Sequence, residues 1–470
     1  MNTPVVKRYI SVDLATDHGE VVLVTFTDGK PAIETVHAFP TRKVEMAGKT
    51  FWNLYSIYDE VIEGLSRIGK RRIQIESIGI DSWSCDFVCL AKDGTFIGLP
   101  RCSDPAYTAS SQAGFFKKKI SASEYYSVSG AQIRDTLTAF QLFAQRKEKN
   151  EALDYARNIL FISDALAYML TGKKAANIVQ LSAAGLLNAV SGKIYKDAVK
   201  ASHVKPKRIP SVISPASKLS RITEEVSSRT GLDRIPVVAT AASSVASAVC
   251  SLPLEADGSA FLYIGDTAYM GIETSSLAIN ARTAEVNLSN ERTVDGKFLM
   301  FKYFTGMELL GDCLRAWAKE GKDCSKEAIA GLLESSVPSA AMLDLEDRQL
   351  VKPEDAPSAV SKYCSSKEMK APSDDAALVR LIYDSFADKC ADTLRKIQGV
   401  SPFRIKSLCV AGPFASDPFL CRLIANDCGM NVTAVKVNAS ALGNIAVQAG
   451  MTRAELAEYI ETDTFKPETT

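Results

Sequence analysis

The chain has 470 residues, 46% of them apolar. This length exceeds what one hydrophobic core usually supports and therefore predicts two or more domains. Lys plus Arg (55) balances Asp plus Glu (55), and no run approaches the ~20 apolar residues of a membrane span, so we expect a cytoplasmic protein without a nucleic-acid or membrane partner.

The first eighty residues predict a sheet with one covering helix. Residues 8–39 show three extended segments separated by short polar turns, which is typical of an antiparallel meander. Apolar residues then recur at helical spacing over 54–68. The apolar segment SIGID follows as a strand that ends at Asp81.

The second half repeats this order and indicates an internal duplication. The segments AFLYIG and YMGIE predict a second hairpin, and SLCVAG at 407–412 predicts a later strand. A long amphipathic helix precedes that strand and ends at Gly399. We expect an N-terminal domain at 1–250 with a helical insertion at about 120–235, a C-terminal domain at 258–455 and a tail at 456–470.

Six blocks, in order along the chain, resemble the FGGY carbohydrate kinases and most of all their rhamnulokinase branch. The resemblance implies an α/β fold of two duplicated actin-like ATPase (ribonuclease H-like) domains with a cleft between them. It also implies transfer of the γ-phosphoryl group of Mg-ATP to a ketose such as L-rhamnulose. The blocks are FP-R with a helix at 39–68, SIGIDSWSCDF, FISDALAYMLTG, PVVATAASSVASAV, TGMELLGDCLRAW and ALGNIAVQAG.

The first phosphate loop of the family is altered here. The resemblance makes Asp13 an organiser of hydrated magnesium and Gly19 part of the nucleotide loop, and both are present. A glycine of the family has become Ala15, and its usual arginine has become Glu20. Asp13 taken alone also fits the turn of any β-hairpin.

The second nucleotide loop and the adenosine-side segment are also altered. Where the family has Ser-Gly-Thr, this chain has Gly265, Asp266 and Thr267, so a carboxylate lies on the expected phosphate path. Gly412 remains from the adenosine-side glycines, and Asn444 remains in the ALGN block. We expect Gly265, Thr267, Gly412 and Asn444 to serve the nucleotide.

The catalytic aspartate of the family is replaced. Its position is Ser244, and the preceding histidine position is Ser243. A neutral hydroxyl does not accept the proton of a sugar hydroxyl near pH 7, and loss of a positioned base costs roughly 10²- to 10⁴-fold in rate. Either serine also fits the N-cap of the helix that follows.

The sugar pocket retains only part of the family pattern. Trp83 and Asp86 match its aromatic and carboxylate positions, although a buried tryptophan and a strand-end aspartate are equally common as structural residues. The family's Arg-Asp pair is reduced to Asp104 after a serine, and the pocket asparagine becomes Leu137.

Three hypotheses follow. The preferred one is a rhamnulokinase-like protein with weak or absent phosphoryl transfer, which includes a sugar- or nucleotide-binding regulatory pseudokinase. The second is an active kinase that uses Asp266 or Glu308 as its base. The third is an interaction protein on the same fold, and a monomer and a dimer both stay open.

Overall fold

The computed structural model describes residues 5–118 and 120–468 and divides by contacts into two units. The first unit comprises the described residues up to Ser251, with Thr274–Met300 and Asn438–Tyr459. The second comprises Leu252–Glu273, Phe301–Val437 and the described residues from Ile460 onward. Residues 274–300 and 438–459, which we expected in the C-terminal domain, therefore group with the first unit.

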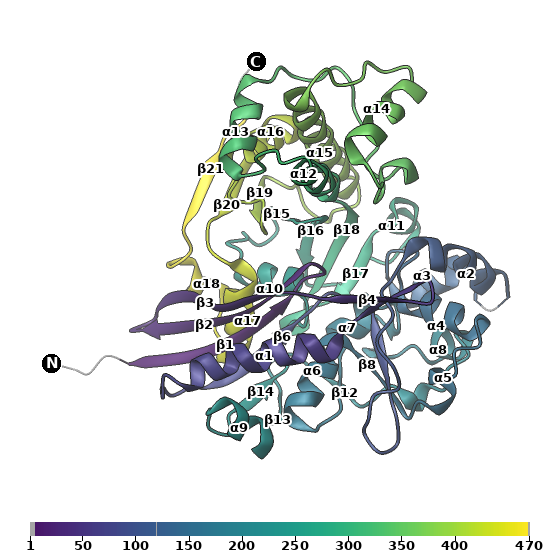
Figure 1. Ribbon diagram of the computed structural model, residues 1–470, viewed down its shortest axis with the longest axis vertical. Coiled ribbons are helices and arrows are strands. Elements are labelled where there is room, and N and C mark those ends of the chain that lie inside the picture. The colour runs from purple at the N-terminus through teal and green to yellow at the C-terminus, as the bar shows by residue number, and fades with distance from the viewer. Residues whose placement is uncertain (1–4, 119, 469–470) are drawn as a thin grey trace. The chain divides into compact units, whose positions relative to one another are not determined.

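The first unit is built on a six-stranded sheet (Figure 1). The predicted meander is confirmed, because β1 pairs antiparallel with β2 and β2 with β3. β6 adds parallel to β1, and β14 adds parallel to β6. The order is β13-β14-β6-β1-β2-β3, with β1 at Val6–Leu14, β2 at His18–Thr27, β3 at Lys30–Pro40, β6 at Ser77–Asp81, β13 at Lys218–Arg221 and β14 at Pro236–Val238.

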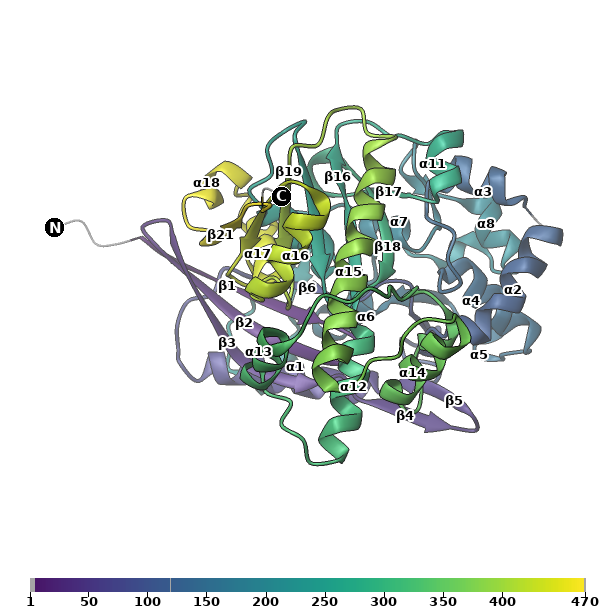
Figure 2. The same cartoon turned by 90° about the horizontal axis from the view of Figure 1, so that it is seen from above.

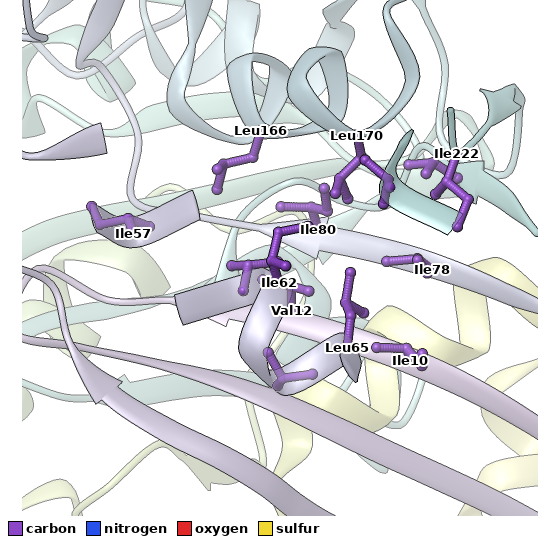
Figure 3. Close-up of a cluster of buried hydrophobic side chains, with 14 of the residues drawn as sticks. Ile10, Val12, Ile57, Ile62, Leu65, Ile78, Ile80, Leu166, Leu170 and Ile222 are labelled. Atoms are coloured by element: carbon purple, nitrogen blue, oxygen red, sulfur yellow. The ribbon is translucent and has the colours of Figure 1, made fainter. Parts of the chain in front are cut away.

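Helices cover both faces of this sheet. Helix α1 (Leu54–Gly69), predicted from its periodicity, buries its apolar stripe in a core shared with alternate residues of β1 and β6 (Figure 3). Helices α10 (Ser244–Ser251) and α17 (Ala439–Ala449) pack against each other, and α17 contacts β1 and β6. Successive residues of a strand face opposite sides of the sheet. The residues of β1 and β6 that alternate with those in the α1 core therefore face α17.

The segment between β6 and β13 is rich in helices (Figure 2). Its buried residues form a separate core that is rich in aromatic side chains. A β4–β5 hairpin (Lys43–Met46, Lys49–Trp52) precedes it. Its elements are β7 (Phe87–Leu90), α2 (Pro105–Lys118), α3 (Ala122–Ser129), α4 (Thr138–Lys147), α5 (Ala152–Tyr155), β8 (Asn158–Phe161), α6 (Ile162–Thr171), β9 (Ala176–Asn177), α7 (Ile178–Ala183), β10 (Leu187–Asn188), β11 (Lys193–Ile194), α8 (Lys196–Ala201) and β12 (Val212–Ile213). Helix α9 (Glu224–Thr230) lies between β13 and β14.

Three later segments complete the first unit: α11 (Ala281–Val286), β17 (Ser289–Arg292) and α18 (Arg453–Ala457). The side chain of Asn287 accepts a hydrogen bond from the N–H of Ile133 at 2.8 Å and donates one to its carbonyl at 2.9 Å. These bonds hold residues 274–300 to the insertion, which is the reason that they group with it.

The second unit repeats the strand order of the first. β15 (Ser259–Ile264) and β16 (Thr267–Thr274) form an antiparallel hairpin, and β19 (Ser407–Ala411) adds parallel to β15. Six strands run in the order β18-β16-β15-β19-β20-β21. The remaining elements are β18 (Phe298–Thr305), β20 (Asn431–Val435), β21 (Thr462–Phe465), α12 (Glu308–Lys319), α13 (Lys326–Ser335), α14 (Ala356–Ser366), α15 (Asp375–Gln398) and α16 (Pro418–Cys428).

The repeated meander and parallel strand support the predicted duplication. The long helix before SLCVAG is confirmed as α15, which ends at Gly399 as its C-cap. The segment that we expected to be a tail instead contains the edge strand β21, which pairs antiparallel with β20. None of the helices in the described part of the chain combines the length and apolar character that a membrane crossing requires.

Candidate functional site

Two carboxylates meet at the carboxyl ends of parallel strands in the first unit. Asp13 lies near the end of β1, Asp81 ends β6, and the two are direct partners in the parallel ladder. Ile10 and Val12 face the α1 core, so Asp13 faces the opposite side of the sheet. The sequence reasoning recognised Asp81 only as a strand end. The parallel placement of SIGID beside β1 was the missing information.

Short hydrogen bonds hold both carboxylates. The hydroxyl of Ser244 donates to Asp13 Oδ1 at 2.5 Å, and the hydroxyl of Thr240 donates to Asp81 Oδ1 at 2.7 Å. Asn444 Nδ2 donates to Asp81 Oδ2 at 2.9 Å. Burial, followed by repulsion from Asp81, raises the pKa of Asp13 to about 7. Burial also raises the pKa of Asp81.

The two serines at the start of α10 have different roles. Ser243 Oγ accepts a hydrogen bond from the N–H of Ala246 at 3.1 Å, which is the geometry of an N-cap. Ser244, the position of the family base, instead donates a hydrogen bond to Asp13. The N-cap interpretation is therefore correct for Ser243 and wrong for Ser244.

The turn after Asp13 is tightly packed at Gly19 and carries two acidic residues, Asp17 and Glu20. Gly19 packs under an aromatic ring, since a Cβ atom there would lie 2.5 Å from the ring of Phe39. Asp17 Oδ1 lies 2.8 Å from His18 Nδ1, and Glu20 Oε2 accepts from Asn438 Nδ2 at 3.3 Å. Gly19 thus has a packing reason to be present, independent of any nucleotide.

The Asp13–Asp81 pair fits hydrated magnesium. Mg²⁺ in proteins commonly takes one or two carboxylates and keeps several waters. Burial raises the pKa of both carboxyl groups, and the charge of Asp81 adds to the shift at Asp13, so a divalent cation would stabilise the charged forms. Within the described residues, no group of three or more His, Cys, Asp or Glu side chains is arranged to bind a metal. A site here would therefore depend on these two carboxylates and water.

Asp86 is enclosed by hydrogen-bond donors. Trp52 Nε1–H donates to its Oδ2 at 2.6 Å and Trp83 Nε1–H at 3.1 Å, while Gln141 Nε2 donates to Oδ1 at 3.2 Å. The rings of Trp52 and Trp83 lie 4.1 Å apart between centroids. Asp86 is fully buried, and burial raises its pKa. Asp86 thus orients two tryptophans, and its role toward a sugar stays a prediction.

Sequence reasoning missed Trp52 and Gln141, because each lies far from Asp86 along the chain. The other predicted pocket residues are less central. Asp104 is exposed and its carbonyl accepts from the N–H of Thr108 at the start of α2. Leu137 is buried in the aromatic core of the insertion. Only Trp83 presents a half-buried ring beside the enclosed carboxylate.

In the second unit, Gly265, Asp266 and Thr267 form the turn between β15 and β16. The Gly265 carbonyl accepts from the N–H of Met307 at 2.9 Å, and the Asp266 carbonyl accepts from the N–H of Gly306 at 2.8 Å. A Cβ atom at Gly306 would lie 2.3 Å from the Gly265 oxygen. The turn is therefore clamped to the start of α12 by backbone contacts.

Acidic residues gather beside this turn. Burial raises the pKa of Glu308, and the charges of Asp266 and Asp312 add to the shift. Lys352 Nζ lies 3.8 Å from Glu308, and Arg315 contacts Asp312. Two cations thus offset the charge of three carboxylates only in part. The remaining negative charge disfavours binding of a triphosphate beside this turn.

The surviving adenosine-side glycine fits a close backbone approach. Gly412 has φ of +98°, and a Cβ atom there would lie 2.5 Å from the carbonyl oxygen of Ile264. Any other residue would be strained at this φ. Asn444, also expected at the nucleotide, is instead fully buried in the first unit against Asp81. The nucleotide roles of Gly412 and Asn444 stay predictions.

Known proteins match almost the whole chain. Residues 8–250 match the N-terminal domain, and residues 261–451 the C-terminal domain, of the FGGY family of carbohydrate kinases. A rhamnulokinase of Bacteroides thetaiotaomicron is 32% identical over 94% of this chain and 90% of its own length. A rhamnulokinase of Klebsiella pneumoniae is 27% identical over 97% and 92%.

The fold is shared with solved kinase structures. A gluconate kinase from Lactobacillus acidophilus superposes with a TM-score of 0.76 at 14% identity, over 99% of this chain and 94% of that one. Such structures have the two-domain α/β architecture of actin-like ATPases, which confirms the predicted fold class.

Proposed function

Because this chain belongs to the FGGY family of carbohydrate kinases, we propose that it is a rhamnulokinase-like protein whose phosphoryl transfer from Mg-ATP to a ketose such as L-rhamnulose is weak or lost. One observation carries the proposal. The position of the family base holds Ser244, and its hydroxyl is 2.5 Å from Asp13 as a donor.

The proton balance of the reaction explains the weight of this contact. When a sugar hydroxyl attacks the γ-phosphorus, the O–H bond breaks, the P–O bond to ADP breaks, and the sugar proton must go to a base. A serine hydroxyl does not take that proton near neutral pH. The Ser244 hydroxyl also donates a hydrogen bond to the Asp13 carboxylate, so its own hydrogen already has a partner.

The remaining residues have separate tasks in this proposal. Bound Mg-ATP supplies the phosphoryl group and charge neutralisation. Asp13, together with Asp81, would hold the hydrated magnesium. The ring of Trp83 would pack against the sugar. Glu20 and Asp266 put negative charge in the two loops that face phosphate in the family, which lowers nucleotide affinity. In the cytoplasm, residues 1–250 would bind the sugar and residues 258–455 the nucleotide.

The decisive experiment restores the base. A coupled ADP-release assay with Mg-ATP and L-rhamnulose compares the unmodified protein with Ser244→Asp, and Ser243→Asp serves as the control because it puts the same charge one residue away on an N-cap. We expect Ser244→Asp to raise ketose-dependent turnover by roughly 10²-fold or more, and Ser243→Asp to leave it unchanged. Robust ketose-dependent ADP release by the unmodified protein would refute the proposal.

A second candidate is an active kinase with a relocated base. The raised pKa of Glu308, which burial causes, is the observation that favours it, because a general base works best with a pKa near the working pH. If the unmodified protein is active, Glu308→Gln or Asp266→Asn should lower turnover at least about 10²-fold. Unchanged turnover in both variants excludes these two residues as the base.

A regulatory pseudokinase is the alternative outcome of the same proposal. Titration calorimetry with Mg-ATP, with L-rhamnulose and with both separates the cases. Binding of either ligand without turnover indicates a ligand-binding regulatory protein. Absence of binding for both indicates an interaction protein that uses only the surface of the fold.

A further inference from the structure

The first unit contains a cavity of about 260 Å³ outside the residues discussed so far. It lies between β5, β7, the loop that follows β7, and the segment from the end of α4 to α5. An engineered apolar cavity of about 150 Å³ binds benzene, so this one has room for a ring with a short side chain. Its lining comprises Lys49, Phe51, Phe87, Cys89, Ile97, Leu99, Arg101, Gln145, Glu148, Lys149, Asn150 and Ala152.

The apolar part of the lining suits the body of a ligand. Phe87 and Cys89 are buried residues on one face of β7, two positions apart. Phe51, Ile97 and Leu99 are half-buried and complete this apolar part. Two aromatic rings among these residues favour an aromatic ligand, because ring pairs attract in edge-to-face or offset geometry.

The polar part of the lining carries a net positive charge. Glu148 Oε2 accepts from Lys49 Nζ at 3.0 Å and from Arg101 Nη1 at 2.7 Å. Lys149 adds a third cation beside this single carboxylate. The Arg101 side chain is only 14% exposed, and its guanidinium stacks on the Tyr107 ring at 3.4 Å. A fixed, poorly hydrated guanidinium is a good partner for a carboxylate.

From this combination we propose that the cavity is a second ligand site, which binds a small anion with an apolar body, of the aromatic carboxylate class. The ring lies against Phe51, Phe87 and Leu99. The carboxylate competes with Glu148 for Lys49 and Arg101. The site is separate from the carboxylate pair and from the residues proposed for phosphoryl transfer.

The cavity is connected to the tryptophan pair through two adjacent residue pairs. Phe51 lines the cavity, and the next residue, Trp52, donates to Asp86. Phe87 also lines it and directly follows Asp86. Occupation of the cavity should therefore change the environment of Trp52 and Trp83, which are two of the three tryptophans of the chain. Intrinsic tryptophan fluorescence gives a readout that does not require kinase activity.

The test uses 3-phenylpropanoate as the probe and 3-phenyl-1-propanol as its uncharged counterpart. Binding to the full chain is followed by calorimetry and tryptophan fluorescence. We expect the carboxylate to bind at least tenfold more tightly than the alcohol. Ile97→Phe and Leu99→Trp, which fill the cavity by different routes, should each abolish binding while thermal unfolding shows that the fold is kept.

Charge variants test the polar part in both directions. Glu148→Gln should tighten carboxylate binding at least threefold, because it releases Lys49 and Arg101. Lys49→Gln should weaken binding at least threefold. Lys147→Gln is the matched control, since Lys147 is exposed at the end of α4, next to Glu148, and does not line the cavity. Three results would overturn the inference: no binding of the carboxylate, equal binding of the alcohol, or unchanged binding by a folded cavity-filling variant.

Discussion

The two units place acidic residues at the same point of a repeated fold, yet treat them differently. In the first unit, Asp13 and Asp81 accept hydrogen bonds from side chains of neighbouring elements. In the second unit, the turn with Asp266 is held through backbone carbonyls, and the nearby Glu308 faces like charges. One repeated topology therefore supports a fixed carboxylate pair in one unit and a partly compensated acidic cluster in the other.

This difference separates what the strand order fixes from what individual side chains decide. The strand order brings the carboxyl ends of β1 and β6 side by side, and likewise those of β15 and β19, whatever residues occur there. The side chains of α10 and α17 decide whether a carboxylate is held in one position. Substitutions in both units test whether only the first unit fixes its carboxylates.

The largest expected effect concerns the helix contact behind the carboxylate pair. A Cβ atom at Gly443 would lie 1.7 Å from the carbonyl oxygen of Ser247, so Gly443→Ala forces α17 away from α10. We expect the free energy of unfolding to fall by about 4 kcal/mol. Gly331→Ala in α13 is the control: no atom lies within 4 Å of the new Cβ, and it should stabilise by about 0.5–1 kcal/mol. Denaturant unfolding measures both, and equal effects would show that the contact is not rigid.

A second comparison removes one hydroxyl from each unit. Thr240→Val deletes the 2.7 Å hydrogen bond to the buried Asp81 and should cost about 2 kcal/mol. Thr267→Val deletes a 3.4 Å contact with Tyr303 and should cost less than about 0.5 kcal/mol. Similar losses in chemical denaturation would contradict the view that only the first unit fixes its carboxylates.

The pH dependence of stability tests the Asp13–Asp81 pair. The ordinary pKa of Asp13 is 3.8 and the folded value is about 7, so the folded state binds the proton more tightly than the unfolded chain. The contribution of Asp13 to stability is then most favourable below pH ~4 and is lost as pH rises toward 7. Asp13→Asn should remove this loss, so that the variant loses less stability than the unmodified protein between pH 4 and pH 8.

Magnesium and a neighbouring aspartate provide the controls for this experiment. Mg²⁺ should raise the melting temperature of the unmodified protein at pH 8 but not that of Asp13→Asn. Asp17→Asn should act in the opposite sense, because the hydrogen bond from His18 lowers the pKa of Asp17 and its contribution is lost as pH falls. Identical pH profiles for the unmodified protein and Asp13→Asn would contradict a raised pKa of Asp13.

The smallest expected effect concerns the acidic cluster of the second unit. Glu308→Gln removes a partly buried charge that faces Asp266 and Asp312, and it sacrifices only a 3.8 Å contact with the exposed Lys352. We expect a gain of about 0.5–1 kcal/mol at pH 8 that disappears below pH ~4, where the carboxyl group is neutral in both states. Glu334→Gln on the exposed face of α13 should change nothing. Thermal unfolding at both pH values decides, and a loss of stability at pH 8 would mean that Lys352 compensates Glu308 fully.

Local patterns predicted the regular elements well, because helical periodicity and strand alternation are properties of the chain itself. The meander at residues 8–39, helix α1 and helix α15 follow from apolar spacing alone. The replacement of the base by Ser244 was also visible, because it depends on one residue at the start of a helix. Strand β21 was not predicted, since a short edge strand has little apolar pattern.

The amino-acid sequence alone indicated the family, the two-part α/β fold and the altered residues in the loops. Which of those residues contact one another became visible in the folded chain. It placed Asp81 beside Asp13, Ser244 in contact with Asp13, and Asn444 on Asp81. It also enclosed Asp86 between Trp52 and Trp83. Apart from Trp83, which lies three positions from Asp86, these hydrogen bonds join residues from 34 to 363 positions apart, so sheet order and helix packing set their distances rather than local sequence.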